Sequence, residues 1–302
     1  RTGGLVGEVD SYTTITIENS YNTGDVTSTS SYSYPGGLVG GAGLHSDITI
    51  TNSYNTGDVT STSSHSFYAG GLVGRVETTT ITNSYNTGNV TSTTTSDSIS
   101  SAGGLVGYAS DTTTITNSYN TGNVTSTTTS SSPTSYYYSV GGLVGRVDNN
   151  GSLSCCHNIG DISAPKSAYR VGAIAGDVDS YVFTKCYYYC EGASGGVGGK
   201  DVSGTSENAN LLGSDIIIRS QSDYTNTALW TEPFWDFDNT WKIVNDMNGN
   251  YPVLKELTEF TLTVNPNGGT WNGSGSSQSF TQNYNTIKSI PNPETRYGYY
   301  FD

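Results

Sequence analysis

The sequence predicts an all-β fold, a right-handed parallel β-helix (β-solenoid) of about six to seven coils. The pentapeptide Gly-Gly-Leu-Val-Gly recurs at steps of 33, 34, 33 and 38 residues, and a worn copy, Gly-Ala-Ile-Ala-Gly, follows 31 residues later. A fixed period of this length is typical of stacked repeats. The intervening residues are rich in Thr, Ile, Val and Tyr, which favour strands. The copies lie at Gly3–Gly7, Gly36–Gly40, Gly70–Gly74, Gly103–Gly107, Gly141–Gly145 and Gly172–Gly176.

Each repeat is expected to form three short strands. The first is the pentapeptide, whose glycines suit a narrow corner with no room for a Cβ atom. The second is a Thr/Ile stretch such as Thr80–Thr82, and the third is a Val-Thr-Ser-Thr run such as Val90–Thr93. Between them stands the block Asn-Ser-Tyr-Asn-Thr-Gly, whose Asn-Thr-Gly part is expected to supply the turn, because Gly and Asn tolerate positive φ. With the Asp/Asn-Val that follows, this block lies at Asn19–Val26, Asn52–Val59, Asn83–Val90 and Asn117–Val124, and degraded at Cys155–Ile162.

Coils stacked about 4.8 Å apart would place equivalent side chains above one another. The Leu, Ile and Val of the three strands are therefore expected to form inward columns. The Tyr of the block predicts an aromatic ladder, continued by His157 and Tyr187, and the next Asn predicts an amide ladder. These ladder residues are Tyr21, Tyr54, Tyr85 and Tyr119, and Asn22, Asn55, Asn86 and Asn120.

The composition limits the partners of the chain. Charged residues make up 13% of its 302 residues, and 26 acids against 12 bases give a net charge of −14. Nucleic acids and anionic membranes both require basic patches, so neither is an expected partner. No apolar run approaches the roughly 20 residues that span a bilayer, so no membrane insertion is expected. The chain begins inside a repeat and without a signal peptide, which is typical of a piece of a longer protein.

Repeat length varies mostly in the Ser/Thr-rich stretch before each pentapeptide, and residues 125–140 hold the longest version. Insertions in solenoids map to loops on one edge. Because these loops carry aromatic residues, we expect an exposed aromatic strip that binds ligand. The candidate ligand-binding residues are Tyr32, Tyr34, Phe67, Tyr68, Tyr136, Tyr137, Tyr138 and Tyr169.

The repeated Gly-Leu-Val-Gly with Asn-Ser-Tyr-Asn-Thr-Gly-Asp-Val resembles the GLUG-motif repeats of bacterial surface proteins and adhesins, over about residues 1–190. The segment from Cys186 to Trp241, with Asn250–Leu254, looks like the unit that commonly ends such arrays, and indicates a capping unit over 191–257. Phe260–Thr270 resembles the opening of an internalin-type B-repeat (Listeria–Bacteroides repeat). That resemblance implies a small β-grasp-like module over 258–302, truncated at the end of the chain.

These resemblances imply an extracellular, cell-surface adhesin or a rigid surface stalk. The implied partners are a host surface glycan or protein, or neighbouring copies of the chain itself. The resemblances supply no catalytic residues. A second interpretation is a purely structural spacer or a self-associating filament component. A third is an ice-binding protein, because the outward Thr residues form regular arrays, although Thr is also the polar residue that most favours strands.

A β-helix polysaccharide lyase is the enzymatic alternative. Such a site needs acids clustered with Arg or Lys across adjacent coils, and the position after the pentapeptide forms a mixed column without a second acidic column beside it. The three histidines fall at unrelated repeat positions, so no nucleophile–base pair can be argued. We therefore expect no enzymatic activity. The mixed column consists of Glu8, Gly41, Arg75, Tyr108, Arg146 and Asp177.

Two further columns leave alternatives open. Cys156 and Cys186 occupy the column of Ser53 and Ser84, and one coil apart they could form a disulfide or remain buried thiols. A turn column alternates Asp with Asn, which indicates either bridging calcium or a ladder of Asx hydrogen bonds. No other metal site is expected. The turn column consists of Asp25, Asp58, Asn89, Asn123 and Asp161.

The C-terminal part offers two more candidates. Trp230, Trp235 and Trp241 could stack on sugar rings, but a cap over the end of the solenoid is the simpler interpretation. Gly192–Lys200 resembles a phosphate-binding loop at first sight. Its spacing does not fit, because Ser194 replaces the first Gly of that motif, so we expect a Gly-rich surface loop.

Overall fold

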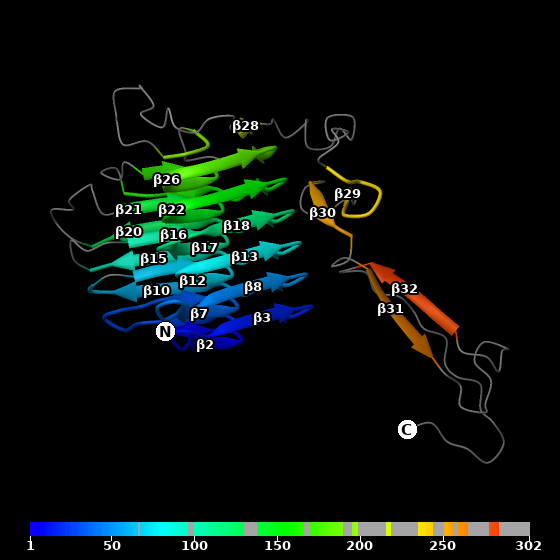
Figure 1. Cartoon of the computed structure of the whole chain (residues 1–302), viewed down its shortest axis with the longest axis horizontal. Helices are drawn as coiled ribbons and strands as arrows, with labels where there is room; N and C mark the ends of the chain where they lie inside the picture. Colours follow the sequence, from blue (N-terminus) through cyan, green and yellow to red (C-terminus); the bar gives the residue numbers. More distant parts are fainter. Residues whose placement is uncertain are drawn as a thin grey trace, which may run out of the picture.

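The computed structural model describes residues 1–65, 67–95, 100–129, 138–165, 170–189, 195–198, 216–218, 235–243, 251–255, 259–264 and 278–283. These residues form a parallel β-solenoid and contain no helix (Figure 1). The predicted fold class is thus confirmed, but with about five complete coils rather than six to seven. A sixth coil lacks one strand among the described residues, and two short segments belong to a seventh. In this part of the chain, no helix has the length and apolar character needed to cross a membrane.

Each coil contains five strands instead of the predicted three, and we number the five rows of strands in chain order. The third coil shows them: β11 (Phe67–Gly70), β12 (Val73–Val76), β13 (Thr78–Thr82), β14 (Tyr85–Asn86) and β15 (Val90–Thr94). The sequence did not predict two of these strands. One consists of the residues before the pentapeptide, and the other is the Tyr-Asn pair of the block; both form hydrogen-bonded pairs with the equivalent residues of neighbouring coils.

The other strands continue these rows. Row 1 holds β1 (Thr2–Gly3), β6 (Pro35–Gly36), β11, β16 (Ser100–Gly103), β21 (Tyr138–Gly141) and β25 (Arg170–Gly172). Row 2 holds β2 (Val6–Val9), β7 (Val39–Ala42), β12, β17 (Val106–Ala109) and the first parts of β22 (Val144–Ser154) and β26 (Ala175–Thr184). Row 3 holds β3 (Thr14–Glu18), β8 (Asp47–Thr51), β13, β18 (Thr113–Thr116) and the remainders of β22 and β26. Row 4 holds β4 (Tyr21–Asn22), β9 (Tyr54–Asn55), β14, β19 (Tyr119–Asn120), β23 (His157–Asn158), β27 (Cys186–Tyr188) and β28 (Ile216–Ile218). Row 5 holds β5 (Val26–Ser28), β10 (Val59–Ser63), β15, β20 (Val124–Thr128) and β24 (Ile162–Ser163).

The pentapeptide is a corner between two rows, not a strand of its own. Gly70 ends β11 in row 1 and Val73 begins β12 in row 2. At Gly71, between them, an added Cβ atom would lie 2.0 Å from the carbonyl oxygen of Gly104 in the next coil. Real Cβ atoms do not approach a backbone oxygen so closely, so this corner requires glycine. The predicted close approach of backbones is therefore the reason for the glycines.

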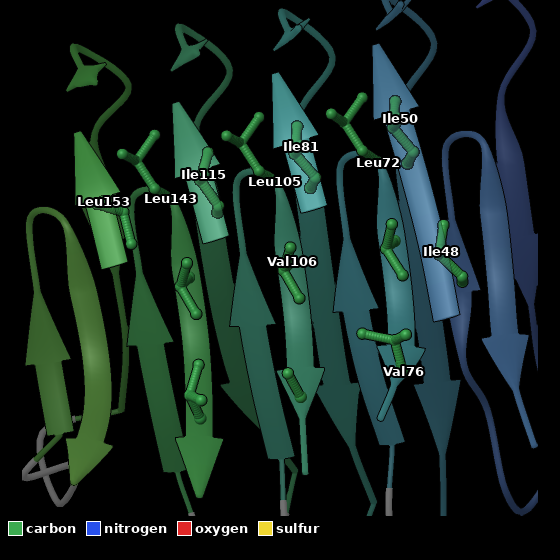
Figure 2. Close-up of a cluster of buried hydrophobic side chains, with 14 of the residues drawn as sticks. Ile48, Ile50, Leu72, Val76, Ile81, Leu105, Val106, Ile115, Leu143 and Leu153 are labelled. Carbon is green, nitrogen blue, oxygen red and sulfur yellow. The ribbon is translucent and has the colours of Figure 1, made fainter. Parts of the chain in front are cut away.

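Two apolar cores hold the rows together. The larger lies between rows 2 and 3 and contains the predicted Leu and Ile columns (Figure 2). Leu72, Ile81 and their equivalents in neighbouring coils are fully buried. The second core joins the Val column of row 5, including Val90, to small residues of row 1 such as Ala102. Leu5 is 46% exposed because the first coil has a neighbouring coil on one side only.

Row 4 carries both predicted ladders. The rings of Tyr21, Tyr54, Tyr85 and Tyr119 stack with centroids 4.8–5.1 Å apart, and His157 continues the stack at 4.9 Å. Each Asn side chain donates a hydrogen bond of 2.8–2.9 Å to the Asn of the next coil. The positive φ of the block falls on its first Asn, at 47–49° in four coils, and not at Asn-Thr-Gly as expected. This residue turns the chain from row 3 into row 4.

The glycine-rich segment that was expected to be a surface loop continues the solenoid. Ala173 and Ile174 donate backbone hydrogen bonds of 2.8 Å to the carbonyl oxygens of Gly195 and Gly196. Val197 pairs with Ala175, which occupies the Val position of the pentapeptide. Residues 195–198 therefore form the pentapeptide corner of a seventh coil, which the sequence hid because Gly196 replaces the expected Leu.

Residues 235–243 and 251–255 pack against the side of the solenoid, whereas the sequence suggested a cap over its end. Strands β29 (Trp241–Ile243) and β30 (Pro252–Leu254) form an antiparallel pair beside row 4 (Figure 1). Trp235 and Trp241 are buried against the ladder residues Tyr119 and His157. Farther along, β31 (Glu259–Val264) and β32 (Gln278–Asn283) form a second antiparallel pair.

Candidate binding edge

The solenoid has two opposite edges with different roles. At one edge row 4 is covered by residues 235–243 and 251–255. At the other, which we call the loop edge, row 5 ends, row 1 begins and row 2 turns into row 3. In Figure 1 the arrows of β10 and β15 point to the loop edge, and those of β8 and β13 point away from it. The strands that flank the variable stretches therefore end and begin at one edge.

Register places two neighbouring columns of side chains at this edge. One column lies two residues before each pentapeptide, and the other directly follows it. We call them the Tyr–Arg columns. They contain all four arginines of residues 1–189, in a chain of net charge −14. The first column is Arg1, Tyr34, Tyr68, Ser101, Ser139 and Arg170, and the second is Glu8, Gly41, Arg75, Tyr108, Arg146 and Asp177.

Aromatic rings dominate the columns in the second to fourth coils. The ring of Tyr68 stacks on Tyr34 at 5.3 Å and on Tyr108 at 4.4 Å. The guanidinium of Arg75 lies 5.4 Å from the Tyr34 ring centroid, and that of Arg1 lies 5.9 Å from it. Cations at this distance are attracted to the negative face of the ring. Burial is the main cause that raises the pKa of Tyr68, so its hydroxyl stays protonated at neutral pH.

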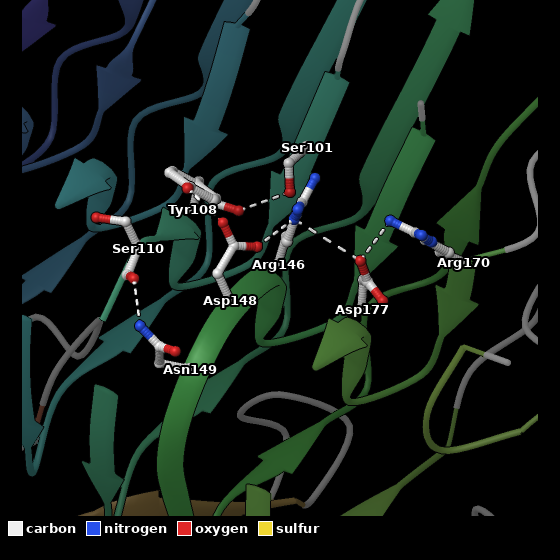
Figure 3. Close-up of polar contacts among 9 residues, drawn as sticks. Ser101, Tyr108, Ser110, Arg146, Asp148, Asn149, Arg170 and Asp177 are labelled. Atoms are coloured by element: carbon white, nitrogen blue, oxygen red, sulfur yellow. Dashed lines mark hydrogen bonds and ion pairs between the residues drawn. The ribbon is translucent and has the colours of Figure 1, made fainter. Parts of the chain in front are cut away.

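Ion pairs dominate the columns in the fourth to sixth coils (Figure 3). Arg146 Nε lies 2.6 Å from Asp148 and 3.7 Å from Asp177, which also pairs with Arg170 at 2.5 Å. The hydroxyl of Tyr108 donates a 2.6 Å hydrogen bond to Asp148. Burial and this hydrogen bond raise the pKa of Tyr108. Burial opposes the charge of Arg146, but the two carboxylates outweigh it and raise the pKa of its guanidinium.

Asp148 is the acid that sequence reasoning missed. The mixed column was expected to lack a second acidic column beside it, an expectation that says nothing of a single acid, and β22 carries Asp148 to within hydrogen-bond distance of both Arg146 and Tyr108. The register of β22 with β26 shifts between Val147 and Asn150. The signal in the sequence is the polar run Asp-Asn-Asn-Gly, which replaces the usual short turn into row 3.

Four stretches of the chain match the model of the GLUG motif, at residues 1–27, 31–60, 65–91 and 98–125. The chain therefore carries GLUG motif repeats. Each GLUG match covers one coil from row 1 to row 5, so the motif is one turn of the solenoid. The coil from β21 to β24 fills the same five rows with four strands, because β22 spans rows 2 and 3, although this coil lies outside the four matches.

Two other comparisons accompany the GLUG match. No curated protein matches the chain. A crystal structure from Bacteroides ovatus, of a protein provisionally named an immunoglobulin A1 protease, is similar with a TM-score of 0.44 and 18% sequence identity. The likeness covers 80% of this chain and 75% of that one.

The GLUG coils bring together only part of the predicted aromatic strip. Tyr32 is 58% exposed, and Tyr34 and Tyr68 are half-buried in the Tyr–Arg columns. Phe67 and Tyr138 are fully buried, so they cannot bind ligand as predicted. Strand alternation is the reason, since both residues face the same side of row 1 as the core residues Ala69 and Val140. The remaining candidates, Tyr136, Tyr137 and Tyr169, lie outside the described residues.

Exposed aromatic residues also occur where row 2 turns into row 3 in the first two GLUG coils. Tyr12 is 79% exposed and Leu44 is 59% exposed. The rings of Tyr12 and His45 lie 5.0 Å apart, and both residues have a positive φ, of 62° and 56°. A bulky residue rarely adopts this conformation, so neighbouring contacts must hold it there. The only signal in the sequence is the longer spacing between pentapeptide and Thr/Ile stretch in these coils.

The turn column of Asp and Asn is a hydrogen-bond ladder. Asp25 Oδ1 accepts the backbone N–H of Asp58 at 2.9 Å, and Asp58 Oδ1 accepts that of Asn89 at 2.7 Å. The pattern continues through Asn123 to Asp161. An oxygen acceptor is all that this ladder needs, which explains why Asp and Asn alternate. Among the described residues, no group of three or more His, Cys, Asp and Glu could hold a metal ion.

Cys156 and Cys186 are free thiols in the structure, so of the two alternatives the disulfide is not formed. Each sulfur points at backbone carbonyls instead. The Cys156 sulfur lies 3.2 Å from the Ser154 oxygen, and the Cys186 sulfur lies 3.4 Å from the Leu153 oxygen. Burial raises the pKa of the Cys156 thiol.

Proposed function

We propose that the chain is an extracellular, cell-surface adhesin that presents its loop edge to host glycans or proteins and has no catalytic activity. One observation carries the proposal. The loop edge gathers exposed or half-exposed aromatic side chains and all the arginines of residues 1–189, whereas residues 235–243 and 251–255 cover the opposite edge. Aromatic residues and Arg are the side chains that most often anchor a binding surface.

The state of the acids favours binding over catalysis. A lyase or hydrolase needs a carboxylate or another group that is free to move a proton. Asp148 is engaged by Arg146 and Tyr108, and Asp177 is engaged by Arg146 and Arg170. These contacts leave both carboxylates partnered, as in a structural ion network.

The location and the remaining partners follow from the GLUG repeats and the charge. The GLUG repeats support a place on the bacterial surface, where the β-solenoid acts as a rigid support for the loop edge. A net charge of −14 supports a partner other than nucleic acid or an anionic membrane. The B-repeat-like sequence at 258–302 would extend the stalk.

The test uses the whole chain, immobilised on beads, in a glycan array and in adhesion to cultured epithelial cells. We expect specific binding that the double substitution Tyr12→Ser and Tyr32→Ser weakens at least several-fold. Tyr189→Ser is the matched control, because Tyr189 is 38% exposed next to row 4 at the other edge. If wild type binds no glycan and no cell, the adhesin proposal is wrong and a structural spacer or filament component remains.

A further inference from the structure

Tyr68 lies at the centre of the most cationic part of the loop edge. Its ring is stacked between Tyr34 and Tyr108, and each of these two rings has an arginine over its face. Arg75 lies over Tyr34 at 5.4 Å, and Arg146 lies over Tyr108 at 5.8 Å. Both guanidinium groups also interact electrostatically with the Tyr68 hydroxyl. Two cations and the carboxylate of Asp148 therefore lie near the phenol donor.

The ion pairs along the columns leave one arginine out. Four arginines stand with the carboxylates Glu8, Asp148 and Asp177, and a fourth carboxylate, Glu77, follows Arg75 by two residues but contacts His45. Arg1 pairs with Glu8, whereas Arg146 and Arg170 share the two aspartates. Among the described residues, Arg75 contacts a tyrosine ring and has no ion-pair partner. The guanidinium of Arg75 therefore keeps its N–H donors available for charge-assisted hydrogen bonds to an anionic ligand.

We propose that Tyr68 and Arg75, between the rings of Tyr34 and Tyr108, bind the carboxylate or sulfate group of an acidic glycan. This inference rests on the proposed adhesin function and names the ligand class of the same edge. The Tyr68 hydroxyl donates one hydrogen bond to the anionic group, and the Arg75 guanidinium donates one or two more. The columns run along the solenoid axis, so the ligand lies along the stack of coils.

The backbone at this edge favours a glycan over an acidic peptide. Extended peptides usually bind by adding a strand to a free sheet edge. In rows 1 and 2 the backbone groups of the third coil pair with the coils on both sides, so no free edge is offered beside Tyr68 and Arg75. A ligand here must be recognised through side-chain hydroxyl, guanidinium and aromatic groups, which suits a saccharide.

The experiment measures binding of the full chain by calorimetry to four probes. They are a uronic-acid oligosaccharide, a sulfated oligosaccharide, a neutral oligosaccharide of the same length and a polyglutamate peptide. We expect at least one acidic oligosaccharide to bind about tenfold more tightly than the neutral one, and to weaken as salt is raised. The uronate and sulfate arms identify which anionic group is preferred. Tighter binding of the neutral sugar or of polyglutamate would overturn the inference.

Substitutions locate the site. Arg75→Gln is expected to weaken the acidic oligosaccharide about tenfold or more, and Tyr68→Phe, which removes only the hydroxyl, several-fold. Lys185→Gln is the matched control, because it removes a cation near row 4. Since Tyr68→Phe keeps the stacked ring, it tests the site even if Arg75→Gln does not fold. Unchanged binding in Tyr68→Phe and in folded Arg75→Gln would overturn the inference.

Cell adhesion of the same variants separates this inference from the adhesin proposal. If wild type and Arg75→Gln adhere to cells equally, the adhesin proposal stands and the acidic-glycan site is wrong. If wild type binds the acidic oligosaccharide through Arg75 but adheres to no cell, the site stands and the adhesin proposal is wrong. Loss of both activities in Arg75→Gln supports both.

Discussion

The side-chain amide of Asn86 packs directly against Gly71. A Cβ atom added to Gly71 would lie 2.4 Å from Asn86 Cγ. The amide ladder therefore leaves no room for a residue larger than glycine at this position of the pentapeptide corner. Asn86 donates hydrogen bonds to Asn120 Oδ1 at 2.8 Å and to the carbonyl oxygen of Gly88 at 2.7 Å. The two most constant parts of the GLUG repeat are therefore one packing unit.

The amide ladder should contribute strongly to stability at Asn86. Asn86→Ala removes two donated bonds and the acceptor of the Asn55 amide, all of them buried, and we expect a loss of about 3 kcal/mol in the free energy of unfolding. Asn22→Ala, in the partly exposed first coil, should cost about 1 kcal/mol. Urea unfolding measures both, and equal losses would contradict a cooperative buried ladder.

A matched glycine pair tests the close approach of coils. An added Cβ atom at Gly57 would lie 2.1 Å from the Gly24 carbonyl oxygen, whereas at Gly24 the nearest atom would be 3.7 Å away. Both glycines occupy the same repeat position. Gly57→Ala should therefore destabilise by more than about 2 kcal/mol, and Gly24→Ala by less than about 0.5 kcal/mol. Melting temperatures that fall equally in both variants would refute this account of the glycines.

The cysteine column predicts that serine substitutes for Cys156. In other coils the serine of this column makes two hydrogen bonds. The Ser118 hydroxyl donates to the carbonyl oxygen of Thr116, two residues earlier, and accepts the backbone N–H of Ser84 in the preceding coil at 3.2 Å. Cys156→Ser should change stability by less than about 1 kcal/mol. Cys156→Val removes the acceptor and should cost about 1–3 kcal/mol. Equal stability of the two variants in urea would show that this hydrogen bond contributes nothing.

His157 makes stability depend on pH. Burial lowers its pKa to about 3, although Nε2 donates a 3.0 Å hydrogen bond to the Pro252 carbonyl oxygen. In the unfolded state the pKa of this histidine is about 6.5. Between about pH 3 and pH 6.5, His157 therefore binds a proton in the unfolded state but not in the folded state. The free energy of unfolding is thus fully retained above pH 6.5 and falls by up to about 1.4 kcal/mol per unit as pH drops towards 3.

The variant His157→Tyr, which carries the ladder residue of the other coils, isolates this effect. Unfolding measured at several values between pH 4 and 7 should show a smaller acid-induced loss than in wild type. An unchanged slope in His157→Tyr would mean that other groups cause the loss.

How far the sequence predicts this molecule depends on which residues repeat. Side chains that recur in every coil, such as Leu72 and Tyr85, were placed correctly because in-register stacking leaves them one environment. Row 1 was missed because its residues differ between coils, as where Phe67 pairs with Ser100. Asp148 was missed because its position depends on a register shift in a single coil.

The C-terminal part was harder to predict for a different reason. Trp235 and Trp241 are apolar residues without a periodic pattern, and their sequence does not say which exposed surface they cover. Trp235 and Trp241 would be buried equally well in a cap over the end of the solenoid and in a cover over the aromatic ladder of row 4. Only the contacts with Tyr119 and His157 distinguish them.

The central claim is that binding takes place at the loop edge. Hydroxyl-radical footprinting of the whole chain, with and without the glycan that binds best in the array, tests it most directly. The account predicts protection of Tyr12, Tyr32 and Tyr68, with no change at Tyr21 and Tyr189, which are exposed at the row 4 edge. Protection at Tyr21 and Tyr189, with the loop edge still reactive, would contradict it.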